Sequence, residues 1–289
     1  MNHHDFLVEV AGVTPPSRLR ALLVYLAGTL DIISPEETKG LHPLLIPIGR
    51  DEEKSIYGFL RWPTPTSDME LPLVRQHEYG LQLMANSADE MLHRELAWRD
   101  ATPDEEPGPL LAAVNKESML YEVGTVAASG LPLPAYFLLK VGVPSSFFTE
   151  LIDGHLERGD EIAAQVAATR ACSLAPGWGF PNVMMARLLV KLGRLEEARD
   201  AARAALLESV WTLGCPFEPV ARLAGWKDPI DGQPYRKLAD DDSKPLLDRA
   251  AHFMDAIAAE GYDWDPARPE LARRYEEAGL ATLAGLIGR

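Results

Sequence analysis

The stretch LVKLGRLEEARDAARAAL, residues 189–206, decides the fold of this chain. A first helix-compatible run ends at Gly193, and a second run carries small residues at Ala198, Ala202 and Ala205. Glycine is typical of the position just after a helix, where the backbone turns left-handed. Alanines three or four residues apart share one helix face and let a neighbouring helix approach closely. The stretch therefore predicts two antiparallel helices joined by a tight turn.

The preceding segment has the same arrangement. A shift of 34 residues places Gly159 on Gly193, Ala164 on Ala198, Ala167 on Ala201, Ala168 on Ala202, and Ala171 on Ala205. Each copy reads as a helix that ends in glycine, one or two charged residues, and a second helix rich in small side chains. Repeats of this kind bury their apolar faces by stacking on one another. We therefore expect two helical hairpins packed side by side.

Residues 145–210 resemble the tetratricopeptide repeat family. Gly193, Ala198, Ala205 and Leu206 meet that family's pattern, and Gly159, Ala164, Ala171 and Pro176 meet it in the earlier copy. The sequence departs from the pattern where Asn182, Ala168 and Ala202 replace aromatic residues and Val210 replaces a closing proline. The resemblance implies a concave groove, lined by the first helix of each pair, that holds a peptide or a partner helix.

The same resemblance assigns residues to that groove by their offset from the glycines. It gives Phe180, Val183, Arg187 and Lys191 from the later copy, and Thr149, Asp153 and Leu156 from the earlier one. Apolar and basic side chains together suit an extended segment that carries a carboxylate. The alternative is that these residues pack against the N-terminal region or the C-terminal helices.

The regions outside the repeat predict a mostly α protein with TPR-like antiparallel hairpins and a small N-terminal α+β region. Residues 44–48 and 55–62 predict a β-hairpin, and 71–75 a third strand. Ser17 and Ser87 read as N-caps of two further helices. We expect a division into residues 1–100, an acidic linker over 101–109 and a helical domain over 110–289. Helical periodicity covers 110–129, 133–141, 145–158, 161–174, 180–192, 195–209, 245–260 and 269–287.

Charge and composition exclude several classes of function. The chain of 289 residues has a formal net charge of −15, which opposes binding to the phosphates of nucleic acids. The N-terminus lacks the features of a secretory or transit peptide, and no apolar run reaches the roughly 20 residues of a membrane span. These features predict a soluble cytoplasmic protein without membrane insertion. No catalytic motif, cofactor fingerprint or metal-ligand spacing is present, so no catalytic residue, cofactor or metal is predicted.

Two functions remain open from the sequence. The first is a non-catalytic interaction protein, a scaffold, adaptor or assembly factor, whose groove binds a protein or peptide; Arg61 and Trp62, in an aromatic stretch, are further candidate partner contacts. The alternative is an enzyme or small-ligand-binding protein with a pocket between the N-terminal region and the helical array. Arg61, His77 and Glu78 would supply the polar groups of that pocket.

Overall fold

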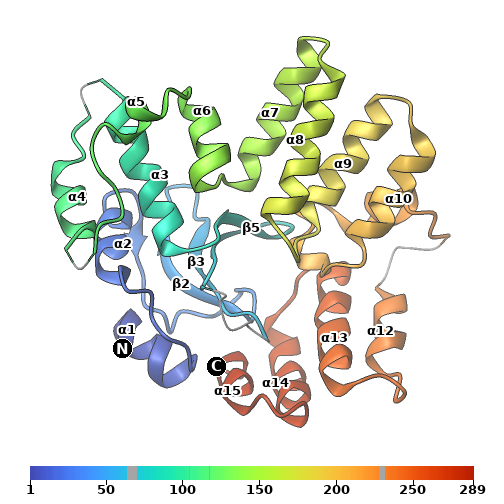
Figure 1. The fold of residues 1–289 in the computed structure, drawn as a ribbon. Helices are drawn as coiled ribbons and strands as arrows, with labels where there is room; N and C mark the ends of the chain where they lie inside the picture. Colours follow the sequence, from blue (N-terminus) through green and yellow to red (C-terminus); the bar gives the residue numbers. More distant parts are fainter. Residues whose placement is uncertain (64–69, 104, 117, 228–231) are drawn as a thin grey trace.

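A five-stranded antiparallel sheet lies at the centre of the molecule, and helices surround it (Figure 1). The computed structural model describes residues 1–63, 70–103, 105–116, 118–227 and 232–289. Each strand pairs with the next one along the chain. The strands are β1 (Asp31–Ile32), β2 (Leu45–Arg50), β3 (Ile56–Leu60), β4 (Leu73–His77) and β5 (Gly80–Ala85).

The sequence predicted β2, β3 and β4, and these three strands are confirmed. It missed the two outer strands, β1 and β5. Pro47 lies within β2, beside a register shift between Pro47 and Gly49. A proline is tolerated at such a bulge because the ladder hydrogen bond is already interrupted there.

Two helices of the N-terminal region show how local signals succeed and fail. Helix α3 (Ala88–Ala101) begins as predicted, because the Ser87 side chain accepts a hydrogen bond from the backbone N–H of Glu90. Helix α2 (Leu19–Leu26) does not use Ser17 as its cap; Arg18 occupies the N-cap position. The Arg18 side chain is buried, forms an ion pair with Asp89 and donates to the backbone carbonyl of Val114.

The middle of the chain forms two helical pairs, as the glycines predicted. They are α7 (Ser145–Glu157) with α8 (Glu161–Leu174), and α9 (Phe180–Lys191) with α10 (Leu195–Ala205). Gly159 and Gly193 both have a φ of +73°, the left-handed turn expected after a helix. Successive helices pack against each other through fully buried alanines, among them Ala164, Ala168 and Ala202.

Several other helices are shorter than the periodicity predicted. The expected helix over 110–129 is wrong, since the chain forms α4 (Gly108–Val114) and, further on, α5 (Thr125–Ser129). The expected helix over 133–141 divides into α6 (Leu133–Tyr136) and a π-helical turn, η2 (Phe137–Val141). The sequence gave no signal for α11 (Phe217–Leu223).

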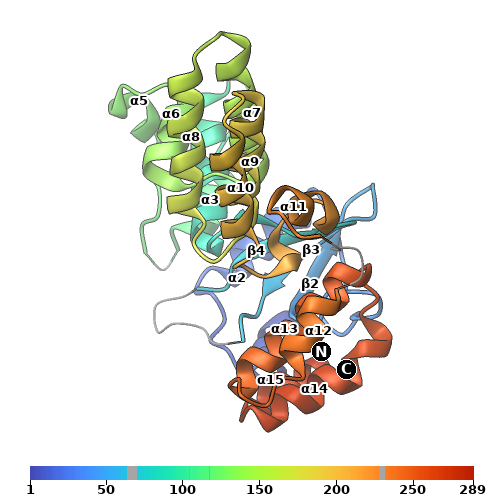
Figure 2. The ribbon, with the colours of Figure 1, turned by 90° about the vertical axis from the view of Figure 1, so that its right-hand side faces the viewer.

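The C-terminal region packs below the sheet, opposite the middle helices (Figure 2). Its helices are α12 (Gln233–Ala239), α13 (Leu246–Glu260), α14 (Arg268–Glu277) and α15 (Ala281–Ile287). The single helix predicted over 269–287 is interrupted at Gly279, whose φ is +83°. Helix α15 returns to the start of the chain and contacts η1 (Phe6–Val10), which follows α1 (His3–Asp5).

Buried polar groups fix the C-terminal region to the rest of the molecule. The Arg268 guanidinium donates to the carbonyls of Thr38, Leu41 and Ile287, so one side chain joins the two ends of the chain. The Asp255 carboxylate accepts the backbone N–H of Val210 at 2.8 Å, which attaches α13 to the segment after the helical pairs. Among the described residues, no helix is long and apolar enough to span a membrane.

Candidate functional site

A groove opens between α7 and α9, the first helices of the two pairs. It consists of two adjoining cavities of about 390 and 270 Å³, which share Thr149, Met184 and Arg187 in their walls. We call it the inner groove. Its further lining residues are Arg75, His77, Leu81, Gln82, Ser145, Ser146, Ile152, Asp153, Leu156, Phe180, Val183, Leu188, Val190, Lys191, Leu213, Gly214 and Leu223.

The inner groove brings together the residues that the helical offset selected. Phe180, Val183 and Arg187 line its smaller cavity, and Asp153, Arg187 and Lys191 line its larger one. Phe180 and Val183 are almost fully buried, so they form the floor and expose little surface of their own. Leu188 and Ile152, which are also buried, belong to the wall of the larger cavity.

The charges of the inner groove differ in how they are neutralised. The Lys191 ammonium forms an ion pair with Asp153 at 2.7 Å across the two helices, and both side chains are about half exposed. Arg187 is exposed, and within the described part of the chain no carboxylate pairs with it. Burial raises the pKa of the Cys215 thiol, and the positive charge of Arg187 beside it opposes that rise. The groove therefore presents a guanidinium to solvent next to apolar surface.

Arg61 and Trp62 lie elsewhere in the structure. The Arg61 guanidinium is buried and donates to the backbone carbonyls of Ala11 and Trp62. The Trp62 ring packs against Trp178 and Trp211, at centroid distances of 5.9 and 5.3 Å. Both side chains therefore contribute to the core, and neither lines the inner groove.

His77 and Glu78 line a second cavity, of about 360 Å³, where two β-hairpins end against the loop after α13. We call it the hairpin-end pocket. Arg61 is not among its lining residues, which are His42, Glu53, Lys54, Ser55, Ile56, Gln76, His77, Glu78, Gly80, Tyr262 and Trp264. The sequence gave no reason to group His42 and Tyr262, which lie far apart along the chain. Only the packing of the C-terminal loop onto the sheet brings them together.

Both histidines of the hairpin-end pocket are held neutral. Burial lowers the pKa of His42 well below its ordinary value, and the nearby charge of Arg268 lowers it further. Burial and Arg75 together lower the pKa of His77, against a smaller opposing effect of Glu78. In the described part of the chain, no three His, Cys, Asp or Glu side chains gather as a metal-ligand set would.

The fold and its cavities define a class: a mostly α-helical protein with a small N-terminal antiparallel sheet and an open groove between two helical pairs. Three family models match it in order, described as PAB N-terminal (residues 1–141), PAB middle domain (145–227) and PAB C-terminal domain (241–289). The chain is 36% identical over 301 residues to "Protein IN CHLOROPLAST ATPASE BIOGENESIS, chloroplastic" of Arabidopsis thaliana, covering 99% of this chain and 90% of that protein. The chain belongs to the PAB family. No solved structure matches it.

This membership corrects the resemblance to the tetratricopeptide repeat family. The matching models are those of the PAB family, and the middle one covers the two helical pairs from which the resemblance was inferred. The resemblance was wrong because glycine-ended helices and buried alanines are what any closely packed helical hairpin requires. The departures at Asn182, Ala168 and Ala202 were the features that separated this chain from that family.

Proposed function

We propose that this protein is a non-catalytic assembly factor in the biogenesis of an ATPase, and that it holds a segment of a partner protein in the inner groove. The relative's name supports the process, because it is that of a protein in chloroplast ATPase biogenesis. The same name supports an organelle as the location, instead of the cytoplasm predicted from the sequence. The function of the groove rests on its geometry.

The single observation that carries the groove assignment is the exposed Arg187 beside an apolar floor. A partner segment would place apolar side chains on Leu156 and Val190, which are less buried than the floor of the groove, and a carboxylate on the guanidinium. Arginine next to apolar surface is enriched among the residues that contribute most to protein interfaces. Lys191 and Asp153, already paired with each other, would lie at the rim.

The process is tested by removing the protein from its source cells. We expect the ATPase to accumulate to a lower level while transcripts of its subunits are unchanged, as measured by immunoblotting and native gels. Re-expression of the wild-type chain should restore the enzyme. An unchanged amount of assembled ATPase would contradict a role in its biogenesis.

The groove is tested by charge reversal with a matched control. Arg187→Glu changes the charge inside the groove, whereas Arg170→Glu makes the same change on the exposed outer face of α8. We expect Arg187→Glu to lose ATPase subunits from the immunoprecipitate and to fail in complementation, and Arg170→Glu to behave as wild type. If both variants complement equally, the inner groove is not the binding site, although the role in biogenesis would stand.

A further inference from the structure

The inner groove ends against the sheet. Its smaller cavity is bounded there by Leu81 of β5 and by Leu213, which follows η3 (Val210–Thr212), and both leucines are at most 1% exposed. Helix α7 contacts β5 at this end, so the sheet lies at the foot of the helices (Figure 1). The described residues that line the larger cavity are all helical. A segment that runs along the groove toward the sheet therefore meets a solid wall, and we call this the closed end.

The two cavities of the groove differ in charge. Arg187 lines both, but the larger cavity also has the carboxylate of Asp153 in its wall, whereas no described Asp or Glu lines the smaller one. Arg75, the other arginine of the smaller cavity, is already paired with two carboxylates. The Arg187 side chain interacts with the Cys215 thiol, which directly follows Gly214 in the wall of the smaller cavity. The guanidinium is therefore directed toward the closed end.

Neutral hydrogen-bonding groups accompany Arg187 at the closed end. The hydroxyl of Ser146 and the side-chain amide of Gln82 line the smaller cavity, and neither side chain hydrogen-bonds to another described residue. Ser146 is exposed and Gln82 is partly exposed, so a ligand in the cavity can reach both. One guanidinium among neutral donors favours a single carboxylate. A run of acidic residues is not favoured, because the net charge of −15 would repel it.

The larger cavity offers apolar surface a short distance from Arg187. Leu156, Val190 and Leu223 lie in its wall and are all partly accessible, Val190 being 42% exposed. Along α7, the step from Ser146 to Leu156 measures about 15 Å, which an extended chain covers with about four or five residues. The groove therefore fits a short extended segment that has a carboxylate at one end and apolar side chains along the rest.

We propose that the inner groove binds the C-terminus of a partner protein, with the terminal carboxylate at the closed end and the preceding apolar side chains in the larger cavity. Arg187 donates to the carboxylate, and Ser146 and Gln82 hydrogen-bond to the last peptide unit. A chain end fits better than an internal segment, because an internal segment would have to turn away from Leu81 and Leu213. This assignment rests on the proposed function of the groove and specifies which part of the partner is bound.

The full-length protein is tested with a library of short peptides that are attached through their N-termini, vary among small and apolar residues, and have a free C-terminal carboxylate. The tightest binders are then made in solution with an N-terminal fluorophore, once as the free acid and once as the C-terminal amide, and each Kd is measured by fluorescence polarisation. We expect the amide to raise the Kd by about tenfold or more, because a charge-assisted hydrogen bond is lost. Equal Kd values for acid and amide, or no binding by any peptide, would overturn the assignment.

Two variants locate the two ends of the bound peptide. Arg187→Gln removes the charge and should weaken the free acid to the level of the amide, whereas Arg170→Gln, the matched change on the outer face of α8, should alter neither Kd. Val190→Ser removes apolar surface and should raise both Kd values by about threefold or more, with the preference for the acid retained. All three residues are exposed, so each variant should keep the wild-type thermal midpoint. An Arg187→Gln variant that still preferred the acid would overturn the proposal.

Failure of this proposal is distinguishable from failure of the proposed function. If acid and amide bind equally while Arg187→Glu fails in complementation, the groove holds an internal segment, so the binding of a chain end is excluded and the proposed function stands. If the acid is preferred through Arg187 but cells that lack the protein assemble their ATPase normally, the groove binds chain ends in a different process, so the role in biogenesis is excluded and the present proposal stands.

Discussion

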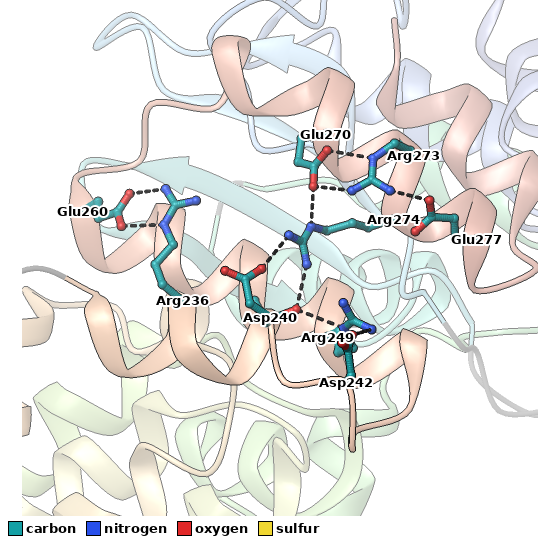
Figure 3. A network of polar contacts seen from close by, with 10 residues as sticks. Arg236, Asp240, Asp242, Arg249, Glu260, Glu270, Arg273, Arg274 and Glu277 are labelled. Carbon is teal, nitrogen blue, oxygen red and sulfur yellow. Dashed lines mark hydrogen bonds and ion pairs between the residues drawn. The ribbon is translucent and has the colours of Figure 1, made fainter.

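The middle helical pairs and the C-terminal helices form their helix–helix contacts with different kinds of side chain. Helices α8, α9 and α10 meet through fully buried alanines. Helices α12, α13 and α14 are joined by arginines that each reach a carboxylate on another helix or loop, as Figure 3 shows. Of the charged side chains of the middle region, Asp153, Arg187 and Lys191 lie in the wall of the inner groove, whereas the arginines of the C-terminal region join its own helices.

The C-terminal network is satisfied within itself. Arg236 pairs with both carboxylate oxygens of Glu260, and Arg274 joins Asp240 to Glu270 (Figure 3). Hydrogen bonds from Arg273 and then from Arg274 lower the pKa of Glu270 to about 2. Charges paired in this way are not available to a partner. The exposed guanidinium of Arg187 pairs with no carboxylate among the described residues, so it indicates a binding site for a partner more strongly than the paired arginines of the C-terminal network do.

The largest expected effect concerns the buried carboxyl where these two regions join. Burial raises the pKa of Asp255 from 3.8 to about 7, which corresponds to about 4 kcal/mol. Because the folded protein holds this proton more tightly than the unfolded chain, the contribution of Asp255 to stability is complete below about pH 4 and is lost as the pH rises to about 7. Asp255→Asn removes this titration but keeps an acceptor for Val210.

We therefore expect Asp255→Asn to gain about 4 kcal/mol over wild type between pH 4 and pH 8, measured by urea unfolding across that range. The gain is measured as the difference between the unfolding free energies of the two proteins at each pH. The contributions of all other titrating groups cancel in this difference. A difference that is flat with pH would show that Asp255 is ionised in both states or neutral in both.

The second effect tests the close contact between α9 and α10. Ala202 is fully buried, and a leucine there would add three carbon atoms where the alanine leaves no space. Overpacking of this kind costs about 1–3 kcal/mol. Ala112→Leu, the same change at an exposed position of α4, should stay within about 0.5 kcal/mol of wild type. Equal stabilities of the two variants in urea unfolding would mean that the helical pairs are loosely packed.

Local signals in the sequence predicted the helices of the middle region, and they predicted some of the residues that line the inner groove. Gly159 and Gly193 mark helix ends wherever the helices pack, so the four middle helices followed from the chain alone. The same offset selected Arg187 and Lys191 for the groove. The position of a residue along a helix predicts whether it lines the groove, because helical periodicity determines which residues share one face of the helix.

The hairpin-end pocket had no such signal. His42 and Tyr262 belong to different regions, and nothing in either local sequence indicates that they face each other. Arg61 was grouped with His77 and Glu78 as the polar residues of one pocket, but its side chain donates to the carbonyls of Ala11 and Trp62. Side-chain direction at the end of a strand depends on the register, which the sequence did not determine. The division at 101–109 stays a prediction.

The smallest effects come from removing one cation from each region. Arg274 is largely buried, donates to the Ala239 carbonyl, pairs with Asp240 and Glu270, and lies 4.6 Å from the centre of the Phe253 ring. Arg274→Met keeps the apolar stem and should cost about 2 kcal/mol, because several charge-assisted hydrogen bonds are lost. Lys191→Met removes a half-exposed partner of Asp153 and should cost less than about 0.5 kcal/mol.

Salt distinguishes the two cases further. The small cost of Lys191→Met should vanish in about 1 M sodium chloride, where exposed charges are screened within about 3 Å, whereas most of the cost of Arg274→Met should remain. Urea unfolding at low and high salt measures both. If Lys191→Met cost as much unfolding free energy as Arg274→Met, the pair between Lys191 and Asp153 would stabilise the fold and would not be available to a partner. A negligible cost instead leaves the Lys191 ammonium free to exchange Asp153 for a carboxylate of a partner.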